Sequence, residues 1–111
     1  MTIEPELRSL IDRFNRHAER TPSVREELQG IERTIAVRLT DGETYSADLK
    51  DGRLQNLRTG PAGRTDVTIV TDTATFRGLV AKEIGPMKAL VTRKLSLEGS
   101  LEDKLLFRKL L

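Results

Sequence analysis

The sequence predicts an α+β fold in which helices pack on one face of a β-sheet. Apolar residues recur at helical spacing over residues 3–18. From residue 32 to residue 59 they alternate with polar residues, as in strands that are covered on one face. Two Asp-Gly pairs separate the alternating segments, which is typical of antiparallel hairpins. A chain of 111 residues builds one hydrophobic core, so we expect a single domain over residues 1–111.

The first predicted helix runs from Glu4 to about Arg20. Pro5 lies in its first turn, where a missing N–H costs nothing, and Thr21-Pro22 ends the helix. The apolar side chains of this helix share one stripe about 100° wide. They are Ile3, Leu7, Leu10, Ile11, Phe14 and Ala18.

A short second helix and four strands come next. Ser23, with Glu26 three residues later, predicts a capping box that begins a helix ended by Gly30. Asp-Gly at residues 41–42 and at residues 51–52 favours type I′ turns, so we expect a three-stranded antiparallel meander. Its strands carry Ile35, Val37 and Leu39, then Tyr45, Ala47 and Leu49, then Arg53 to Thr59. The loop of residues 60–64 leads to a fourth strand, Asp66 to Thr71.

The C-terminal part predicts two helices, a fifth strand and a last helix. Asp72 is the expected N-cap of a helix that Gly85 ends, and Pro86 begins the next helix. The apolar stripes of these two helices are Phe76, Leu79, Val80 and Ile84, and Met87, Leu90 and Val91. Apolar residues alternate with polar ones from Lys94 to Glu98, which predicts the fifth strand. Ser100, with Asp103 three residues on, predicts the cap of a helix that runs through Leu111.

Composition excludes several classes of protein. The chain has no cysteine, so disulfides, thiolate metal sites and thiol nucleophiles are absent. No stretch approaches the roughly 20 apolar residues of a membrane span. The first ten residues lack a basic segment followed by an apolar run, so we expect a cytoplasmic protein.

The residues also give no sign of catalysis, metal binding or nucleic-acid binding. His17 is the only histidine, and neither a metal-ligand set nor a catalytic set accompanies it. The glycine-containing loop of residues 60–64 holds Pro61, which lacks an N–H, and no helix follows it directly. The arginines alternate with acidic residues and no strand carries paired aromatic residues, so no nucleic-acid partner is expected. We therefore expect no enzyme activity and no cofactor.

The segment from Thr65 to Leu111 carries the most specific pattern. Asp66-Val67-Thr68-Ile69 precedes Asp72 and Phe76, then Gly85-Pro86-Met87-Lys88-Ala89, then Lys94-Leu95-Ser96-Leu97-Glu98-Gly99-Ser100-Leu101. Together with the upstream meander, this order resembles the sterol carrier protein 2 family of lipid-binding domains. Three positions depart from the family pattern: Arg93 stands where a glycine often precedes the Lys-Leu strand, and Glu102 and Arg108 stand where glycine and a polar amide are frequent.

The resemblance implies a five-stranded, mainly antiparallel sheet with helices packed on one face and an apolar tunnel between the layers. It implies non-catalytic binding and intracellular transfer of a lipid: a fatty acid, a fatty acyl-CoA, a sterol or an isoprenoid. The wall residues that it implies are Phe76, Leu79, Val80, Ile84, Met87, Leu90 and Val91, with Leu105, Leu106 and Leu110 from the last helix. Arg108 is a candidate for pairing with a carboxylate or phosphate near the mouth, and a solvated charged face is its alternative interpretation.

The last helix is apolar on several sides and must therefore be covered on several sides. Leu101 lies with Leu105, and Leu106 lies with Leu110. A lipid roofed by this helix is one interpretation. The alternative is an interaction module that forms a homodimer, or docks on a lipid-modifying enzyme, through the same helix. Residues 82–111 hold seven basic and four acidic side chains, a charge of +3 that also favours transient contact with an anionic membrane.

Overall fold

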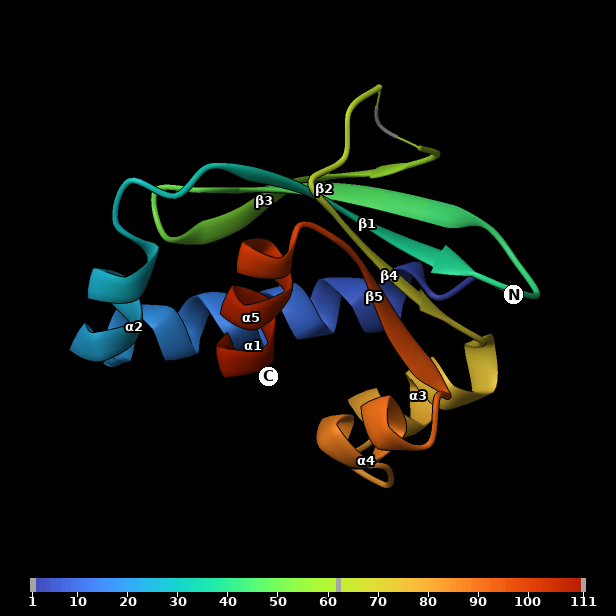
Figure 1. The fold of residues 1–111 in the computed structure, drawn as a ribbon. Coiled ribbons are helices and arrows are strands. Elements are labelled where there is room, and N and C mark those ends of the chain that lie inside the picture. Colours follow the sequence, from blue (N-terminus) through green and yellow to red (C-terminus); the bar gives the residue numbers. More distant parts are fainter. Residues whose placement is uncertain (1, 62, 111) are drawn as a thin grey trace.

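Five strands form one mixed sheet in the order β3-β2-β1-β4-β5 (Figure 1). The computed structural model describes residues 2–61 and 63–110, with side chains described as far as Phe107. β1 and β4 run parallel, and the other neighbouring strands are antiparallel. The expected α+β fold with a mainly antiparallel sheet is confirmed. The strands are β1 (Arg33–Leu39), β2 (Thr44–Lys50), β3 (Arg53–Thr59), β4 (Val67–Thr71) and β5 (Leu95–Gly99).

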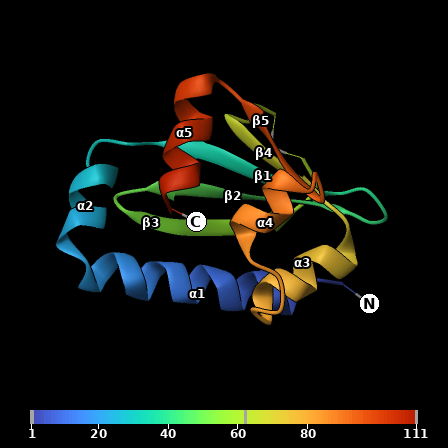
Figure 2. The same ribbon diagram turned by 60° about the horizontal axis from the view of Figure 1, so that its bottom comes forward.

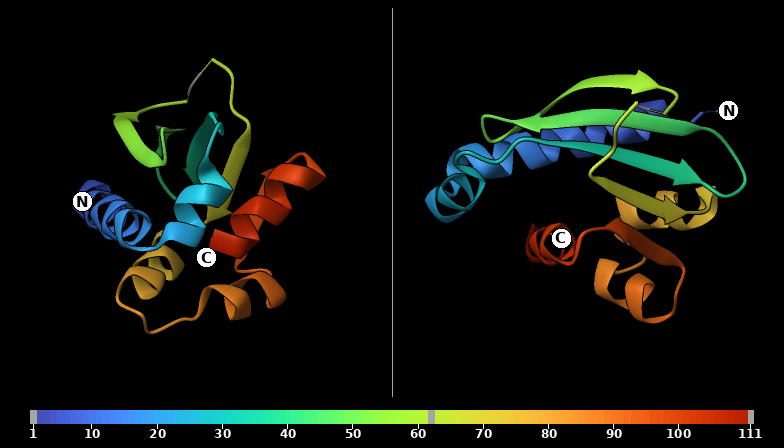
Figure 3. Two further views of the ribbon diagram at one scale, coloured as in Figure 1. Left: turned by 90° about the vertical axis from the view of Figure 1, so that its left-hand side faces the viewer. Right: turned by 45° about the horizontal axis from the view of Figure 1, so that its top comes forward.

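The helices all lie on one side of this sheet (Figures 1 and 3). They are α1 (Glu4–Arg20), α2 (Pro22–Leu28), α3 (Thr73–Val80), α4 (Pro86–Val91) and α5 (Leu101–Leu110). The outer face of the sheet carries polar side chains such as those of Arg38 and Glu98, which form an ion pair at 3.1 Å. One face is therefore covered and the other faces solvent, as the alternation of apolar and polar residues predicts.

The two Asp-Gly turns differ in structure. Asp51 and Gly52 have φ of 54° and 73°, so the predicted type I′ turn is confirmed there. The prediction is wrong for Asp41-Gly42, because neither residue has positive φ and β1 is joined to β2 by a longer loop. The carboxylate of Asp41 instead accepts hydrogen bonds from the backbone N–H and the hydroxyl of Thr73, both at 2.9 Å. These bonds tie the loop to the start of α3 and lower the pKa of Asp41.

The helix ends confirm the predicted cap of α5 and correct two boundaries. The backbone N–H of Asp103 donates to Ser100 Oγ at 3.1 Å, so the cap of α5 is confirmed. Ser23 is not the N-cap of α2, because the chain already turns helical at Pro22, whose fixed φ suits a first turn. α3 ends at Val80 and not at Gly85, since Lys82 takes φ of 62° and breaks the helix.

Gly99 lies where no side chain fits. Its φ is +147°, and a Cβ at this position would lie 2.6 Å from the backbone oxygen of Asp66. Gly99 is the partner of Val67 at the end of the β4–β5 ladder. The glycine of the C-terminal sequence pattern therefore lets β5 approach β4 closely before the chain turns into α5.

Asp72 supports a testable prediction about α3. Its carboxylate accepts hydrogen bonds from the Thr75 backbone N–H at 2.7 Å and the Thr75 hydroxyl at 2.8 Å, and these bonds hold the pKa of Asp72 below its ordinary value of 3.8. Replacing an N-cap aspartate with alanine costs about 1 kcal/mol. We expect Asp72→Ala to lose about that much unfolding free energy at neutral pH, measured by urea denaturation.

The pH dependence of this loss follows from the direction of the shift. A carboxylate with a lowered pKa contributes stability above its unfolded value of 3.8, and the contribution disappears as the pH falls through the folded pKa. The difference between the wild type and Asp72→Ala should therefore shrink at a pH well below 3.8. Asp72→Asn keeps an N-cap acceptor that does not titrate, so it is the control. If Asp72→Ala lost the same unfolding free energy at neutral pH and at a pH well below 3.8, the Asp72 carboxylate would not be the cap that stabilises α3.

Candidate functional site

A cavity of about 640 Å³ lies between the inner face of the sheet and the helices. The helices frame this face when the molecule is turned to bring them forward (Figure 2). The side chains around the cavity are mainly apolar. The sheet contributes Ile35, Val37, Tyr45, Ser46, Ala47, Leu49, Leu54, Leu57, Ile69, Leu95 and Leu97. The helical layer contributes Leu7, Leu10, Ile11, Arg13, Phe14, His17, Phe76, Leu79, Lys82, Pro86 and Phe107.

The cavity exists because the core is divided into two clusters. The first cluster joins the start of α1 to α3 and the strands, and it is made of Ile3, Leu7, Val37, Leu39, Tyr45 and Phe76. The second contains Leu28, Ile35 and Leu49. Ile69 is half-buried and packs against both clusters. The helices thus close against the sheet at two places and leave space over the strands between them.

Asn15 fixes the distance between α1 and the edge of the sheet. It lies on the inner side of α1 and is 6% exposed. Its amide donates to the Leu54 carbonyl at 3.0 Å and accepts from the Leu54 N–H at 2.8 Å. This pair of bonds satisfies the backbone of β3 and holds the α1 wall of the cavity in place.

Three basic side chains interrupt the apolar lining. Arg13 is half-buried, and its Nη2 donates to the Val80 carbonyl at 3.0 Å at the end of α3. His17 and Lys82 are exposed, so they mark where the cavity meets solvent. The hydroxyl of Tyr45 donates to Glu43 at 3.2 Å, and burial raises the pKa of this phenol. The polar groups of the lining are therefore few, and the charged ones are cations.

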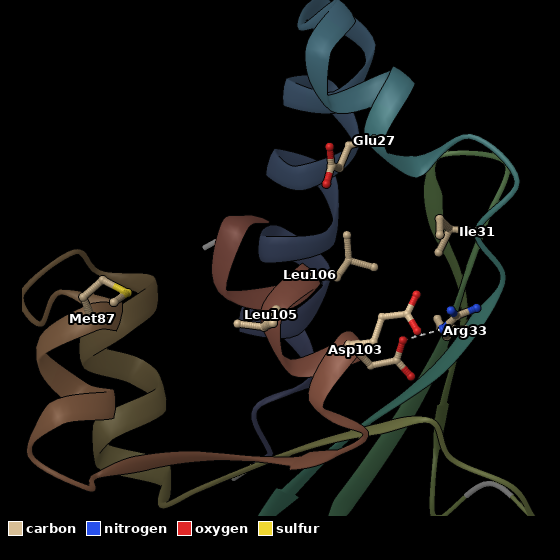
Figure 4. A pocket seen from close by; sticks show the side chains of 8 residues that line it. Glu27, Ile31, Arg33, Met87, Asp103, Leu105 and Leu106 are labelled. Atoms are coloured by element: carbon tan, nitrogen blue, oxygen red, sulfur yellow. Dashed lines mark hydrogen bonds and ion pairs between the residues drawn. The ribbon is translucent and has the colours of Figure 1, made fainter.

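A second cavity, also about 640 Å³, lies between α2, α4 and α5 (Figure 4). Leu106 lies toward Ile31, while Leu105 lies toward Met87. Arg33 on β1 pairs with Asp103 on α5, with 2.7 Å between Nε and Oδ1, and this bond raises the pKa of the guanidinium. The ion pair fastens α5 to the sheet beside the cavity. Glu27 and Glu102 complete the lining of this second cavity.

The predicted wall residues are divided among several places. Phe76 and Leu79 line the cavity against the sheet. Met87, Leu105 and Leu106 line the second cavity. The remaining described residues of the prediction line neither: Val80 packs on the first core cluster, Ile84 packs on Gly78, Leu90 is half-buried, and Val91 is 78% exposed. Arg108 and Leu110 have side chains outside the described part.

The residues that form the α1 side and the sheet side of the wall were not among the predicted wall residues. Sequence signals for both sides were present. Leu7, Leu10, Ile11 and Phe14 share the apolar stripe of α1, and Ile35, Ala47 and Leu97 lie on inward strand positions.

Within the described residues, no group of three or more histidine, cysteine, aspartate or glutamate side chains is placed to hold a metal ion. None of the helices in the described part of the chain combines the length and the apolar composition of a membrane-spanning segment.

A family model described as the SCP-2 sterol transfer family matches residues 12–111. No curated protein matches the chain. Among solved structures, a sterol carrier protein 2 crystal structure has a TM-score of 0.64 and 19% identity, over 92% of this chain and 90% of that chain. The sterol carrier protein domain 2 of Helicoverpa armigera has a TM-score of 0.67 and 13% identity, over 95% and 84%.

Part of an enzyme has a similar fold. A stereoselective inverting sec-alkylsulfatase from a Pseudomonas species has a TM-score of 0.58 and 22% identity over 78% of this chain. This chain spans only 14% of the length of that sulfatase. At these identities, the structures show that the fold is shared.

Proposed function

The chain belongs to the SCP-2 sterol transfer family, and on this premise we propose that it binds one lipid molecule, without catalysing a reaction on it, in the cavity between the sheet and the helices. Family membership indicates lipid binding or transfer in general. The observation that carries the more specific proposal is the apolar cavity of about 640 Å³. Its volume lies within the range of roughly 300–1,000 Å³ of small-molecule sites.

The energy of an empty cavity favours an occupant. The cavity opens to solvent near His17 and Lys82, so it holds either water or a ligand, because a dry void of this volume would cost on the order of 15 kcal/mol. That is as large as the whole stability of a typical domain, about 5–15 kcal/mol. Water is a poor filling, because a buried water needs two to four polar partners and the lining offers few. An aliphatic chain gains about 0.8 kcal/mol for each methylene that it buries, so it is the better occupant.

The basic side chains of the lining favour an acidic or phosphorylated head group. Arg13 reaches the cavity from α1, with His17 one turn further along the same helix and Lys82 beyond the end of α3. A guanidinium binds carboxylate and phosphate oxygens through charge-assisted hydrogen bonds. We therefore favour a fatty acid or fatty acyl-CoA over an uncharged sterol, with the chain over the sheet and the head group near Arg13. A cytoplasmic location and transfer between membranes remain predictions.

Titration with a fluorescent fatty acid tests whether the chain binds one lipid and whether Arg13 contacts its head group. We expect uptake of one probe per chain, and Arg13→Gln should weaken it roughly tenfold or more, as expected for a lost hydrogen bond to a charged group. The same variant should leave the affinity for the matching fatty alcohol nearly unchanged. Arg16→Gln is the matched control, because Arg16 is exposed on the same helix and faces Asp12 at 4.0 Å. Equal losses for acid and alcohol would contradict a head-group role for Arg13.

Native mass spectrometry distinguishes lipid binding from the alternative function, an interaction module. Leu101 and Leu105 on α5 are 74% and 50% exposed, and an interaction module would use this surface to dimerise or to dock on an enzyme. We expect a monomer that takes up one lipid. A dimer that takes up no lipid would overturn the proposal and favour the interaction module.

A further inference from the structure

The surface around α4 combines exposed apolar and basic side chains. Met87 and Val91 lie one helical turn apart on α4 and are 46% and 78% exposed, although Ala89 between them is fully buried. Lys88 is exposed on the same short helix. Apolar side chains bordered by basic ones are the combination found on surfaces that lie in a membrane interface. We call residues 81–94 the α4 rim.

The basic side chains of the α4 rim differ from most arginines of the protein. Elsewhere, arginines such as Arg8, Arg38 and Arg53 are paired with acidic side chains. Within the described residues, no ion pair involves the four basic side chains of the rim, which are Lys82, Lys88, Arg93 and Lys94. Glu83 is the one acidic residue in this stretch, so residues 81–94 carry a charge of +3.

Two of these cations occupy backbone conformations that favour glycine. Lys82 and Arg93 both have φ of 62°. Arg93 ends α4, with its N–H donating to the Leu90 carbonyl at 3.2 Å, at a position where glycine is the usual residue. The α4 rim thus carries a cation near each end, in a backbone conformation that is costly for a residue other than glycine.

The α4 rim also borders the cavity over the sheet. Lys82 and Pro86 contribute to the lining of that cavity, while Met87 and Val91 project from the next turns of the same segment. A surface that covered the rim would therefore lie beside the opening through which a lipid enters or leaves.

We infer that the α4 rim docks on the surface of a bilayer that contains anionic lipids. Met87 and Val91 enter the interface, and Lys82, Lys88 and Arg93 lie against the head groups. The inference rests on the proposed function for its purpose, since docking places the cavity beside a source of lipid. It does not depend on which lipid is bound.

Charge and size favour a bilayer over other partners and other surfaces. The exposed leucines of α5 lie in a stretch, residues 101–107, that holds two acidic side chains and one basic side chain, whereas the α4 rim carries a charge of +3. The exposed side of α1 carries acidic and basic groups in i,i+4 pairs, such as Asp12 with Arg16. A stable protein–protein interface usually buries more than about 1,000 Å² with good shape complementarity. A six-residue helix with two exposed apolar side chains is small for such an interface, but it is enough for contact with a membrane surface that nearby cations strengthen.

Vesicle sedimentation tests the inference with the full chain. We expect the protein to sediment with vesicles of phosphatidylcholine containing phosphatidylserine, and weakly with phosphatidylcholine alone. The double variant Lys88→Glu/Arg93→Glu should lower the fraction bound roughly tenfold or more, because each cation near an anionic surface contributes several-fold. Val91→Asp should also reduce binding. Arg20→Glu/Arg25→Glu is the matched control, since both arginines are exposed, are without an ion pair in the described residues, and lie on α1 and α2.

The outcomes separate this inference from the proposed function. Uptake of the fluorescent fatty acid without vesicles should be unchanged in Lys88→Glu/Arg93→Glu, with the fold checked by circular dichroism. Equal losses in the rim variant and in the control would overturn the inference, because net charge alone would then explain binding. If the wild type takes up the probe but does not sediment with phosphatidylserine-containing vesicles, the inference is also overturned, while the proposed function stands. Docking without uptake would support the inference and contradict the proposed function.

Discussion

Replacing Ala47 with phenylalanine is expected to weaken lipid uptake at least tenfold and to leave the fold intact. Ala47 lies on β2 opposite Ile35, is 9% exposed, and points into the cavity over the sheet. A phenyl ring at this position occupies space that the lipid chain would fill. We expect the dissociation constant of a fluorescent fatty acid to rise at least tenfold, since a chain that loses two or three buried methylenes loses about 2 kcal/mol.

The same substitution should raise the stability of the lipid-free protein. Filling a void recovers part of the cost of roughly 24 cal/mol per Å³. Thermal unfolding of delipidated protein should therefore show a midpoint at or above that of the wild type. Val70→Phe is the control, because Val70 follows Ile69 on β4 and faces the outer side of the sheet. Unchanged uptake by Ala47→Phe would show that the lipid lies elsewhere.

Replacing Phe76 with alanine is expected to cause the largest loss of stability. Phe76 is 5% exposed and packs in the cluster that joins α1 to α3 and the sheet. It also forms part of the cavity wall, so the space left behind adds to an existing void. Removing a buried phenylalanine costs about 3–5 kcal/mol. For a domain of this size we expect the thermal midpoint to fall by roughly 15 °C.

Urea denaturation of lipid-free protein, followed by circular dichroism, measures the loss at Phe76. Phe76→Leu keeps most of the apolar volume, and we expect it to cost less than about 1.5 kcal/mol. A loss below about 1 kcal/mol in Phe76→Ala would show that α3 does not close the cavity in solution. Added fatty acid should restore part of the stability, because a ligand that binds only the folded state stabilises it by mass action.

Local patterns in the sequence predicted most of the fold. The stripe of α1, the alternation in the strands and the cap at Asp72 are set by neighbouring residues, and their positions agree with the structure. Two of the errors arose where a contact outside the local pattern decides the conformation. Asp41 turns its carboxylate to Thr73, so Asp41-Gly42 does not form the expected turn. Ile84 packs on Gly78 after α3 has already ended, so helical spacing did not describe it.

The candidate site was harder to predict, because a pattern identifies inward-facing residues but not where packing leaves space. Phe76 and Leu79 were expected on the wall and do line the cavity over the sheet. Ile69 and Ala47 looked like ordinary core residues, and they line the same space because the two core clusters meet the helices on either side of it. Val91 shares the helical spacing of a core residue, yet it is exposed because only one side of α4 meets the body.

Intermolecular nuclear Overhauser effects between isotope-labelled oleate and the methyl groups of the protein test most directly whether a lipid chain lies over the inner face of the sheet. The proposal predicts contacts from the chain methylenes to Ile35 and Ile69, and none to Val70, which follows Ile69 but faces outward. Contacts confined to exposed methyls such as those of Val91 and Leu101, with none to Ile69, would contradict it.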